Sequence, residues 1–207
     1  VFSSPLGITI NSGNGVGEAG NTFYKNGKNV VIMGPVYIAT GNTGLPGAFT
    51  SGEGGTITFM ANDDESTQPS INDGNTVKSN FGDIVVSANG SLDTTLTLNG
   101  VKIGSIVIEA DQTLVAAGNI ECAGSWTNSG QFTPDTYTVT FSGDSGIITA
   151  GGTGAGYDFH NITFTGITET VGGIGANGIF VTEGGSLTLG GNRSEERRVG
   201  KECTIQC

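Results

Sequence analysis

Residues 96–108 read Leu-Thr-Leu-Asn-Gly-Val-Lys-Ile-Gly-Ser-Ile-Val-Ile, and this stretch decides the class of fold. Leu96-Thr97-Leu98 alternates apolar and polar side chains, and a second apolar strip follows at residues 106–108. Alternation with a period of two residues predicts a pleated strand with one buried face. Asn99-Gly100, between the strips, is a dipeptide typical of sharp turns. The stretch therefore predicts two short strands separated by a sharp turn.

Similar short strips recur along the chain. Gly, Asn, Asp and Ser fill the gaps between them, because these residues adopt the conformations of sharp turns at low cost. We expect strands at residues 56–59, 84–86, 96–98, 106–108, 120–122, 139–141, 162–164, 179–181 and 187–189.

The composition argues against helices. Gly accounts for 37 of the 207 residues, and each Gly inside a helix costs about 1 kcal/mol. The longest stretch without Gly, residues 56–73, contains Pro69 and several turn-forming residues. A collagen helix is excluded because there is no Gly-X-Y period and only 5 Pro. The sequence thus predicts an all-β protein.

Two all-β architectures fit these short strands. Strips 8 to 12 residues apart suit an antiparallel β-sandwich, in which the Asn-Gly pairs at Asn26, Asn89, Asn99 and Asn177 would form hairpins. Weak self-similarity at a spacing near twenty residues instead favours a solenoid of stacked coils, in which these pairs would form corners. One such coil cannot stabilise itself, so its neighbours must supply hydrogen bonds and packing. We favour the solenoid, with the sandwich as the alternative.

A resemblance to a known group of repeats supports the solenoid. Residues 124–134 read Gly-Ser-Trp-Thr-Asn-Ser-Gly-Gln-Phe-Thr-Pro and are followed by Thr-Val-Thr-Phe-Ser-Gly at 138–143 and Asp-Phe-His-Asn-Ile-Thr-Phe at 158–164. This resembles a repeat of large bacterial and archaeal surface proteins, although Ile162 stands where Leu is usual. Residues 184–192 are similar to the strand repeat of autotransporter passenger domains. The resemblance implies a right-handed parallel β-helix displayed outside the cell in adhesin-like proteins, and it implies no catalytic residues.

The last fifteen residues differ from the rest. Arg193, Arg197 and Arg198 are the only Arg residues, and the string from Arg193 to Cys203 resembles a translated sequencing adapter. We therefore expect one β-solenoid over residues 1–192, an interior fragment of a longer chain, and a non-native tail over residues 193–207.

Charge and composition restrict the partners. The net charge of −11 disfavours nucleic acid, and no apolar run approaches the roughly 18 residues of a membrane-spanning helix. Charged residues make up only 13%, so hydroxyl and amide groups must give the exposed faces their solubility. This favours an extracellular or cell-surface location, with a surface glycan or a host or cell-surface protein as the partner.

Two groups of residues are candidates for binding. Trp126 and Phe132 could form an aromatic platform for a sugar ring, although packing inside the fold is the stronger expectation. Asp63, Asp64 and Glu65, with Asp73 nearby, could hold Ca²⁺, but their spacing differs from that of an EF-hand and a solvated loop tip is the favoured interpretation. Calcium binding is left open at this point.

Candidates for catalysis are weaker. The Gly-rich runs at residues 151–156 and 172–177 lack the Asp of a calcium-binding nonapeptide and are expected to form corners. His160 has Asp158 nearby, but a surface histidine is the expected interpretation. Residues 1–192 contain no Arg and only four Lys, at Lys25, Lys28, Lys78 and Lys102, which disfavours a pectate-lyase-like enzyme.

The sequence thus predicts a structural or adhesive segment, a rigid spacer without catalysis. We expect no catalytic residue, cofactor or metal ligand. The alternatives are a fragment of a carbohydrate-active β-helix enzyme and a carbohydrate-binding module built around Trp126.

Overall fold

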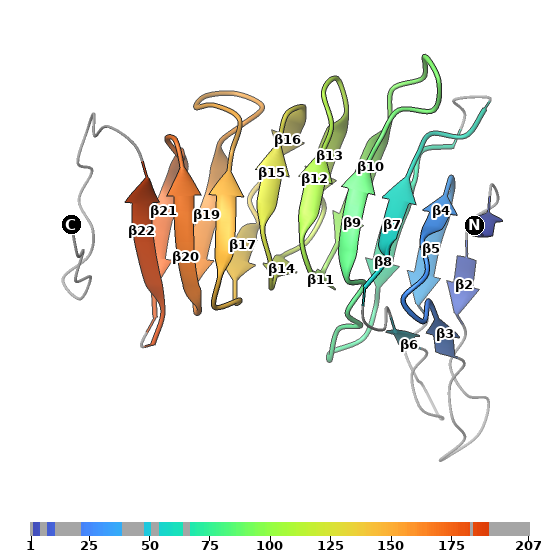
Figure 1. The fold of residues 1–207 in the computed structure, drawn as a ribbon, viewed down its shortest axis with the longest axis horizontal. Helices are drawn as coiled ribbons and strands as arrows, with labels where there is room; N and C mark the ends of the chain where they lie inside the picture. Colours follow the sequence, from blue (N-terminus) through green and yellow to red (C-terminus); the bar gives the residue numbers. More distant parts are fainter. Residues whose placement is uncertain are drawn as a thin grey trace.

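A computed structural model describes residues 2–4, 8–10, 22–38, 48–50, 54–63, 67–182 and 184–190. In these residues the chain forms strands and turns and no helix, so none of them could cross a membrane as a helix. The strands stack side by side along one long axis (Figure 1). All pairings between named strands are parallel, as the repeat pattern predicts.

Three parallel sheets make up the fold, and we name them A, B and C. Sheet A has nine strands, in the order β1 (Phe2–Ser4), β4 (Val30–Ile32), β7 (Thr56–Phe59), β9 (Asp83–Val86), β12 (Ile106–Ile108), β15 (Trp126–Asn128), β18 (Gly146–Thr149), β20 (Ile167–Val171) and β22 (Ser186–Gly190). Sheet B has six, in the order β16 (Gln131–Thr133), β13 (Thr113–Ala116), β10 (Thr95–Asn99), β8 (Ser70–Asp73), β5 (Pro35–Ile38) and β2 (Ile8–Ile10).

Sheet C has five strands, β11 (Val101–Ile103), β14 (Ile120–Cys122), β17 (Thr138–Phe141), β19 (Phe159–Phe164) and β21 (Ala176–Val181). A further parallel pair, β3 (Thr22–Tyr24) and β6 (Ala48–Thr50), lies near the N-terminal end.

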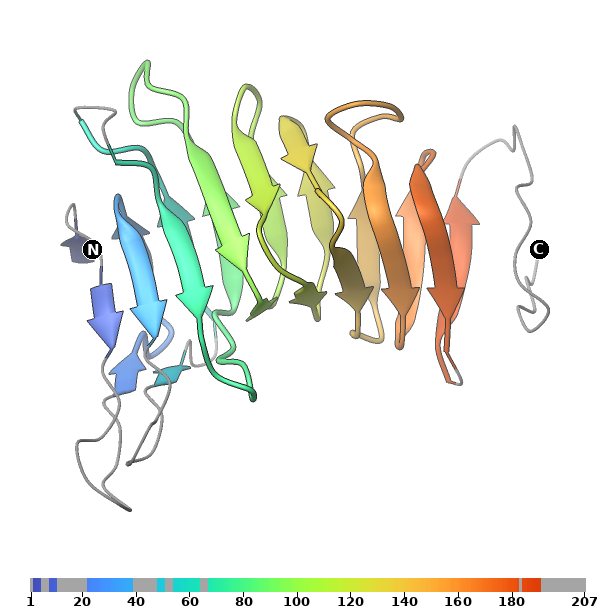
Figure 2. The ribbon, with the colours of Figure 1, turned by 180° about the vertical axis from the view of Figure 1, so that it is seen from behind.

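The chain visits these sheets in turn and so winds into a right-handed coil. In Figure 1 the strands of sheet A run upward at the front, and the chain then runs downward behind while advancing toward the C-terminus. Figure 2 shows the downward strands from the other side. Consecutive strands of each sheet therefore belong to consecutive coils, as in a parallel β-helix. The antiparallel β-sandwich is ruled out, because a sandwich would need antiparallel neighbours.

Each coil takes about twenty residues in the middle of the chain and more near its start. Ser105 and Ser125 occupy equivalent places 20 residues apart, whereas Asn29 and Thr56 do so 27 residues apart. The longer coils contain longer corners, and the strands that they join stay in register. The expected period near twenty is confirmed for the central coils.

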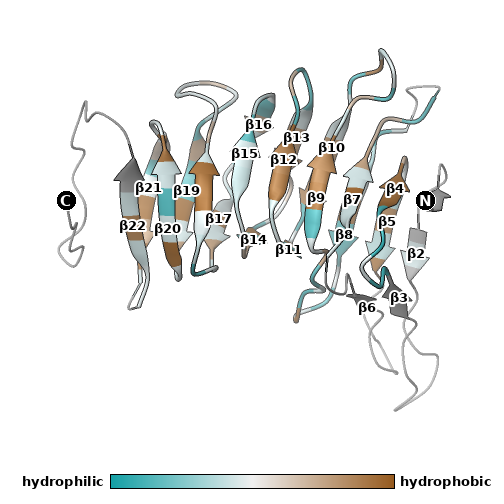
Figure 3. Cartoon of the chain, in the orientation of Figure 1, coloured by the Kyte–Doolittle hydropathy of each residue, from teal (hydrophilic) through white to brown (hydrophobic). Residues whose placement is uncertain are grey.

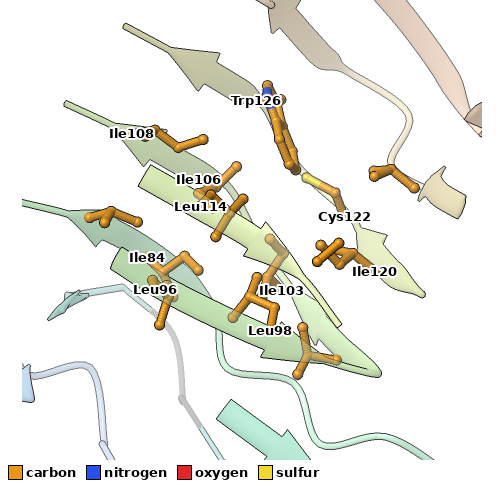
Figure 4. Close-up of a cluster of buried hydrophobic side chains, with 14 of the residues drawn as sticks. Ile84, Leu96, Leu98, Ile103, Ile106, Ile108, Leu114, Ile120, Cys122 and Trp126 are labelled. Carbon is orange, nitrogen blue, oxygen red and sulfur yellow. The ribbon is translucent and has the colours of Figure 1, made fainter. Parts of the chain in front are cut away.

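The interior is a single apolar column. Side chains alternate between buried and outward-facing along almost every strand, as in β10, where Leu96 and Leu98 are buried and Thr95 and Thr97 are not. Figure 4 shows the buried side chains of consecutive coils stacked in the space between the sheets. Figure 3 shows mostly brown and pale residues on the strands and frequent teal residues in the connections. Each of the nine expected strands is present.

The coils change from three sheets to two toward the C-terminal end. Sheet B stops at β16, and the next coil runs from β18 to β19 through the connection at residues 150–158. The backbone N–H of Phe132 donates to the carbonyl of Gly156 in that connection, at 2.7 Å. The connection thus satisfies part of the edge of β16, which would otherwise be open to pairing with another strand.

The Asn-Gly pairs have different places in the coil. Asn26-Gly27 and Asn99-Gly100 lie at corners, and Gly27 and Gly100 have positive φ angles of 67° and 62°. Asn89-Gly90 forms a tight reversal in which the backbones of Asn89 and Leu92 pair. Asn177-Gly178 lies inside strand β21, so the expected corner at this pair is wrong.

Candidate functional site

Trp126 lies in the core and not on the surface. Its side chain is 0% exposed and packs against Phe132 and Phe159, with ring centroids 4.9 and 5.2 Å away. Figure 4 shows it pointing inward beside Cys122. Its indole Nε1 is buried without a hydrogen-bond partner. A sugar platform at Trp126 and Phe132 is therefore excluded, and the packing interpretation is confirmed.

The acidic cluster is only partly described. Asp64 and Glu65 lie outside the described residues, and Asp63 accepts a hydrogen bond from the Asn89 amide at 2.7 Å. Asp73 is buried, and its carboxylate accepts the backbone N–H groups of Asn75 and Ser79 at 3.0 and 2.6 Å. Asp73 thus holds the corner after β8. Among the described residues, no three His, Cys, Asp or Glu side chains are close enough to share a metal ion.

The Gly-rich runs largely confirm the corner expectation. Gly151, Gly154, Gly156 and Gly172 all have positive φ angles, which glycine adopts without strain. The second run ends inside β21, which begins at Ala176. A shallow, open depression lies between the two runs and is lined by Thr149, Gly151, Gly152, Thr153, Val171, Gly172 and Gly173. It offers hydroxyl groups and backbone but no acid or base, so it is no catalytic cleft.

His160 and Asp158 hydrogen-bond to different partners. The Nδ1 atom of His160 accepts from the Asn177 amide at 3.1 Å, in the tautomer that leaves Nδ1 unprotonated. The Asp158 carboxylate accepts the backbone N–H of Gly154 at 2.8 Å and so shapes the corner before β19. Neither residue is placed beside a nucleophile by any contact in the described part of the chain, so the geometry forms no catalytic triad.

Two lysines donate hydrogen bonds to backbone carbonyls at corners, and Lys102 forms an ion pair on sheet C. Lys25 is buried and donates to the Gly54 carbonyl at 2.5 Å, and Lys78 donates to the Asp73 carbonyl at 2.5 Å. Burial lowers the pKa of Lys25, and the negative charge of Asp83 partly offsets this. Lysines held by backbone carbonyls do not resemble a catalytic base beside a metal.

Lys102 and Glu121 form an ion pair of 2.7 Å on the outer face of sheet C. The Ser142 hydroxyl donates to the same Glu121 oxygen at 2.9 Å. Partial burial acts to raise the pKa of Glu121, but the hydrogen bonds from Lys102 and Ser142 and the lysine charge outweigh it, so the pKa is lowered. This cluster joins three coils across their outer face.

Cys122 is the free cysteine of the described residues, and it is buried. Burial raises the pKa of its thiol to about 12, and its Sγ lies 3.2 Å from the Gly104 carbonyl. A thiol with such a high pKa is not a nucleophile at neutral pH. Cys122 is part of the core.

The outer faces of the three sheets differ in charge. Sheet A carries outward Asp83 and Glu169, and sheet C carries Lys102 and Glu121. The described outward side chains of sheet B carry no charge at all, and they are Thr9, Pro35, Tyr37, Ser70, Asn72, Thr95, Thr97, Asn99, Thr113, Val115, Gln131 and Thr133. Sequence reasoning missed this face, because residues far apart in the chain come together only through the register of the coils.

The geometry defines the chain as a parallel β-helix whose described residues form no catalytic constellation. Comparison with known proteins found no matching family model, no matching curated protein and no matching solved structure.

Proposed function

We propose that the chain is a structural, adhesive segment of an extracellular surface protein, in which it acts as a rigid spacer without catalysis. The observation that carries this proposal is the unbroken apolar column, which runs from Val30 in β4 to Phe164 in β19. Each coil between them hydrogen-bonds to the coils before and after it. Bending such a rod would separate ladders and core contacts together, so the rod resists bending.

The surface composition supports the extracellular location. The outer face of sheet B relies on Thr, Ser, Asn and Gln for its hydration, and only 13% of the chain is charged. The resemblance of residues 124–134 and 184–192 to repeats of large secreted surface proteins points the same way.

The contacts of the carboxylates favour a spacer over a carbohydrate-active enzyme. Hydrolysis of a glycosidic bond needs two carboxyl groups facing one another across a groove. Asp73 and Asp158 instead accept backbone N–H groups at corners, and Glu121 is paired with Lys102. These three carboxylates thus stabilise the fold through contacts at corners and between coils.

Distances between spin labels test the rigid rod. Val31 and Thr149 lie in one outward row of sheet A, five strand spacings apart. Spin labels are attached to cysteines introduced at these two positions, in a chain with Cys203 and Cys207 changed to Ser. Double electron–electron resonance should then give a narrow distribution of label-to-label distances near 24 Å. Labels at Val31 and Val107 lie three spacings apart and should give a distance shorter by about 10 Å. A broad distribution, or a distance that does not grow with strand number, would contradict the spacer.

A further inference from the structure

The outer face of sheet B contains one exposed aromatic side chain beside two amides. Tyr37 in β5 pairs in register with Asn72 in β8, and Asn72 pairs with Asn99 in β10. All three point outward, and Tyr37 is 44% exposed. Three consecutive coils thus place a phenol and two carboxamides in one straight row.

The two amides hold each other in place. Nδ2 of Asn99 donates to Oδ1 of Asn72 at 3.4 Å. This contact uses one donor and one acceptor, so it leaves the Nδ2 group of Asn72 as a donor and lone pairs of Asn99 Oδ1 as acceptors. A Cβ atom on Gly118 would lie 2.7 Å from Oδ1 of Asn99, so the glycine leaves space for this amide at the next corner. The two amides thus restrain each other before any ligand binds, which lowers the cost of ordering them.

The surroundings of the row select the chemistry of a ligand. The chain has a net charge of −11, yet the described outward side chains of sheet B carry no charge. Hydroxyl groups of Ser70 and Thr97 form the neighbouring outward row, and the Lys78 ammonium near Gly100, at one end of the row, is held by the Asp73 carbonyl. The face is too poor in apolar side chains to form the dry core of a protein–protein interface. It suits a neutral partner rich in hydroxyl groups.

We propose that this face binds a neutral polysaccharide, with Tyr37 stacking on a sugar ring and Asn72 and Asn99 hydrogen-bonding to hydroxyl groups. A few placed polar groups around an aromatic side chain are the usual means of fixing a ligand's orientation. The coils repeat every 4.7–4.9 Å or so, close to the length of one pyranose ring, so a glycan chain lying along the rod would meet Tyr37, Asn72 and Asn99 on three successive coils. The site deepens the adhesive part of the proposed function, and the rod itself does not depend on it.

Affinity electrophoresis of the full chain tests the proposal. Native gels would contain mixed-linkage β-glucan, galactomannan or dextran as neutral polysaccharides, and polygalacturonate as an acidic one. At least one neutral polysaccharide should retard the chain, and polygalacturonate should not. Tyr37→Ala should raise the dissociation constant obtained from the retardation by at least about tenfold, as for an aromatic residue at the centre of a binding surface. Tyr37→Phe should retain most of the binding, and Asn72→Ala and Asn99→Ala should each lower it several-fold.

Phe180 supplies the matched control. It is 57% exposed on sheet C, so Phe180→Ala removes an exposed aromatic side chain away from the proposed site. Binding should be unchanged in this variant. Absence of retardation by every neutral polysaccharide, equal loss in the Tyr37 and Phe180 variants, or unchanged binding in Tyr37→Ala would overturn the site. A change of oligomeric state in Tyr37→Ala would instead identify the face as a contact between copies of the chain and would also overturn it. Circular dichroism of each variant separates loss of binding from loss of the rod.

Discussion

The hydroxyl of Ser105 accepts a hydrogen bond from the backbone N–H of Ser125, 3.1 Å away and one coil further along the chain. The Ser125 hydroxyl in turn accepts the backbone N–H of Ile147 at 3.1 Å. The Asp83 carboxylate accepts the backbone N–H of Ser105 at 2.8 Å. Side-chain oxygens at the start of the sheet A strands thus continue the backbone ladder into the corners, where parallel strands would otherwise lose their partners.

Replacing a member of this ladder should destabilise the rod. Ser125→Ala removes the acceptor for the Ile147 N–H, and we expect the free energy of unfolding to fall by about 1 kcal/mol. Urea unfolding followed by circular dichroism measures it. Ser129 is exposed at the corner after β15, so Ser129→Ala should change stability by less than about 0.5 kcal/mol. Equal effects of the two changes would argue against the ladder.

The aromatic cluster around Trp126 should be the most sensitive part of the core. Trp126→Ala removes a fully buried side chain and should cost about 3–5 kcal/mol. Trp126→Phe removes the unpartnered Nε1 together with part of the volume, so it should cost clearly less. Denaturant midpoints for both variants, with Phe180→Ala as an exposed aromatic control, measure this. An Ala variant as stable as the parent chain would show that the cluster is not packed as described.

Close approach between coils should make Gly143 intolerant of a side chain. A Cβ atom there would collide with the carbonyl oxygen of Ala123, which belongs to the backbone of the previous coil and cannot move aside cheaply. Gly143→Ala should therefore lower the free energy of unfolding by about 1–3 kcal/mol. At Gly173 a Cβ would meet only the end of the Thr153 side chain, at 3.2 Å, so Gly173→Ala should be mild. A reversed order in thermal unfolding would contradict the stacking of these corners.

Acid should remove the stabilisation that Glu121 supplies. Its pKa lies below the ordinary value of 4.5 in the folded chain, because the contacts with Lys102 and Ser142 outweigh partial burial. Glu121 therefore stabilises the fold above pH 4.5, and this contribution disappears as the pH falls through the lowered pKa. Glu121→Gln should be less stable than the parent at pH 7, and the difference should shrink as the pH falls below 4.5 and through the lowered pKa. A difference that is constant with pH would mean that the charge of Glu121 contributes nothing.

Cys122 should react with thiol reagents only when the chain unfolds. Its thiol is buried and has a pKa of about 12, so it forms almost no thiolate at pH 8. In a chain with Cys203 and Cys207 changed to Ser, a chromogenic disulfide reagent should find no fast-reacting thiol until urea is added. Rapid reaction of the native chain would place Cys122 at the surface.

The alternation of residues such as Leu96, Thr97 and Leu98 predicts strands, because local alternation is sufficient to define a buried face. Strands with fewer apolar residues, such as β16 (Gln131–Thr133), cannot be predicted from local alternation, because the burial of Phe132 depends on the neighbouring coils. The row of Tyr37, Asn72 and Asn99 could not be predicted at all. Asn72 and Asn99 are 27 residues apart, whereas Ser105 and Ser125 are 20 apart, so corner lengths set the register and no fixed period reveals it.

Duplication of one coil tests the central claim, that the coils are equivalent layers of one rod. Residues 106–125 form one complete coil, because Ile106 and Trp126 are partners in register. Three extra copies inserted after Ser125 should fold and lengthen the particle by about 14–15 Å, with the same cross-section, in small-angle X-ray scattering. Inserts that swell the particle in all directions, or that unfold it, would contradict a stacked coil.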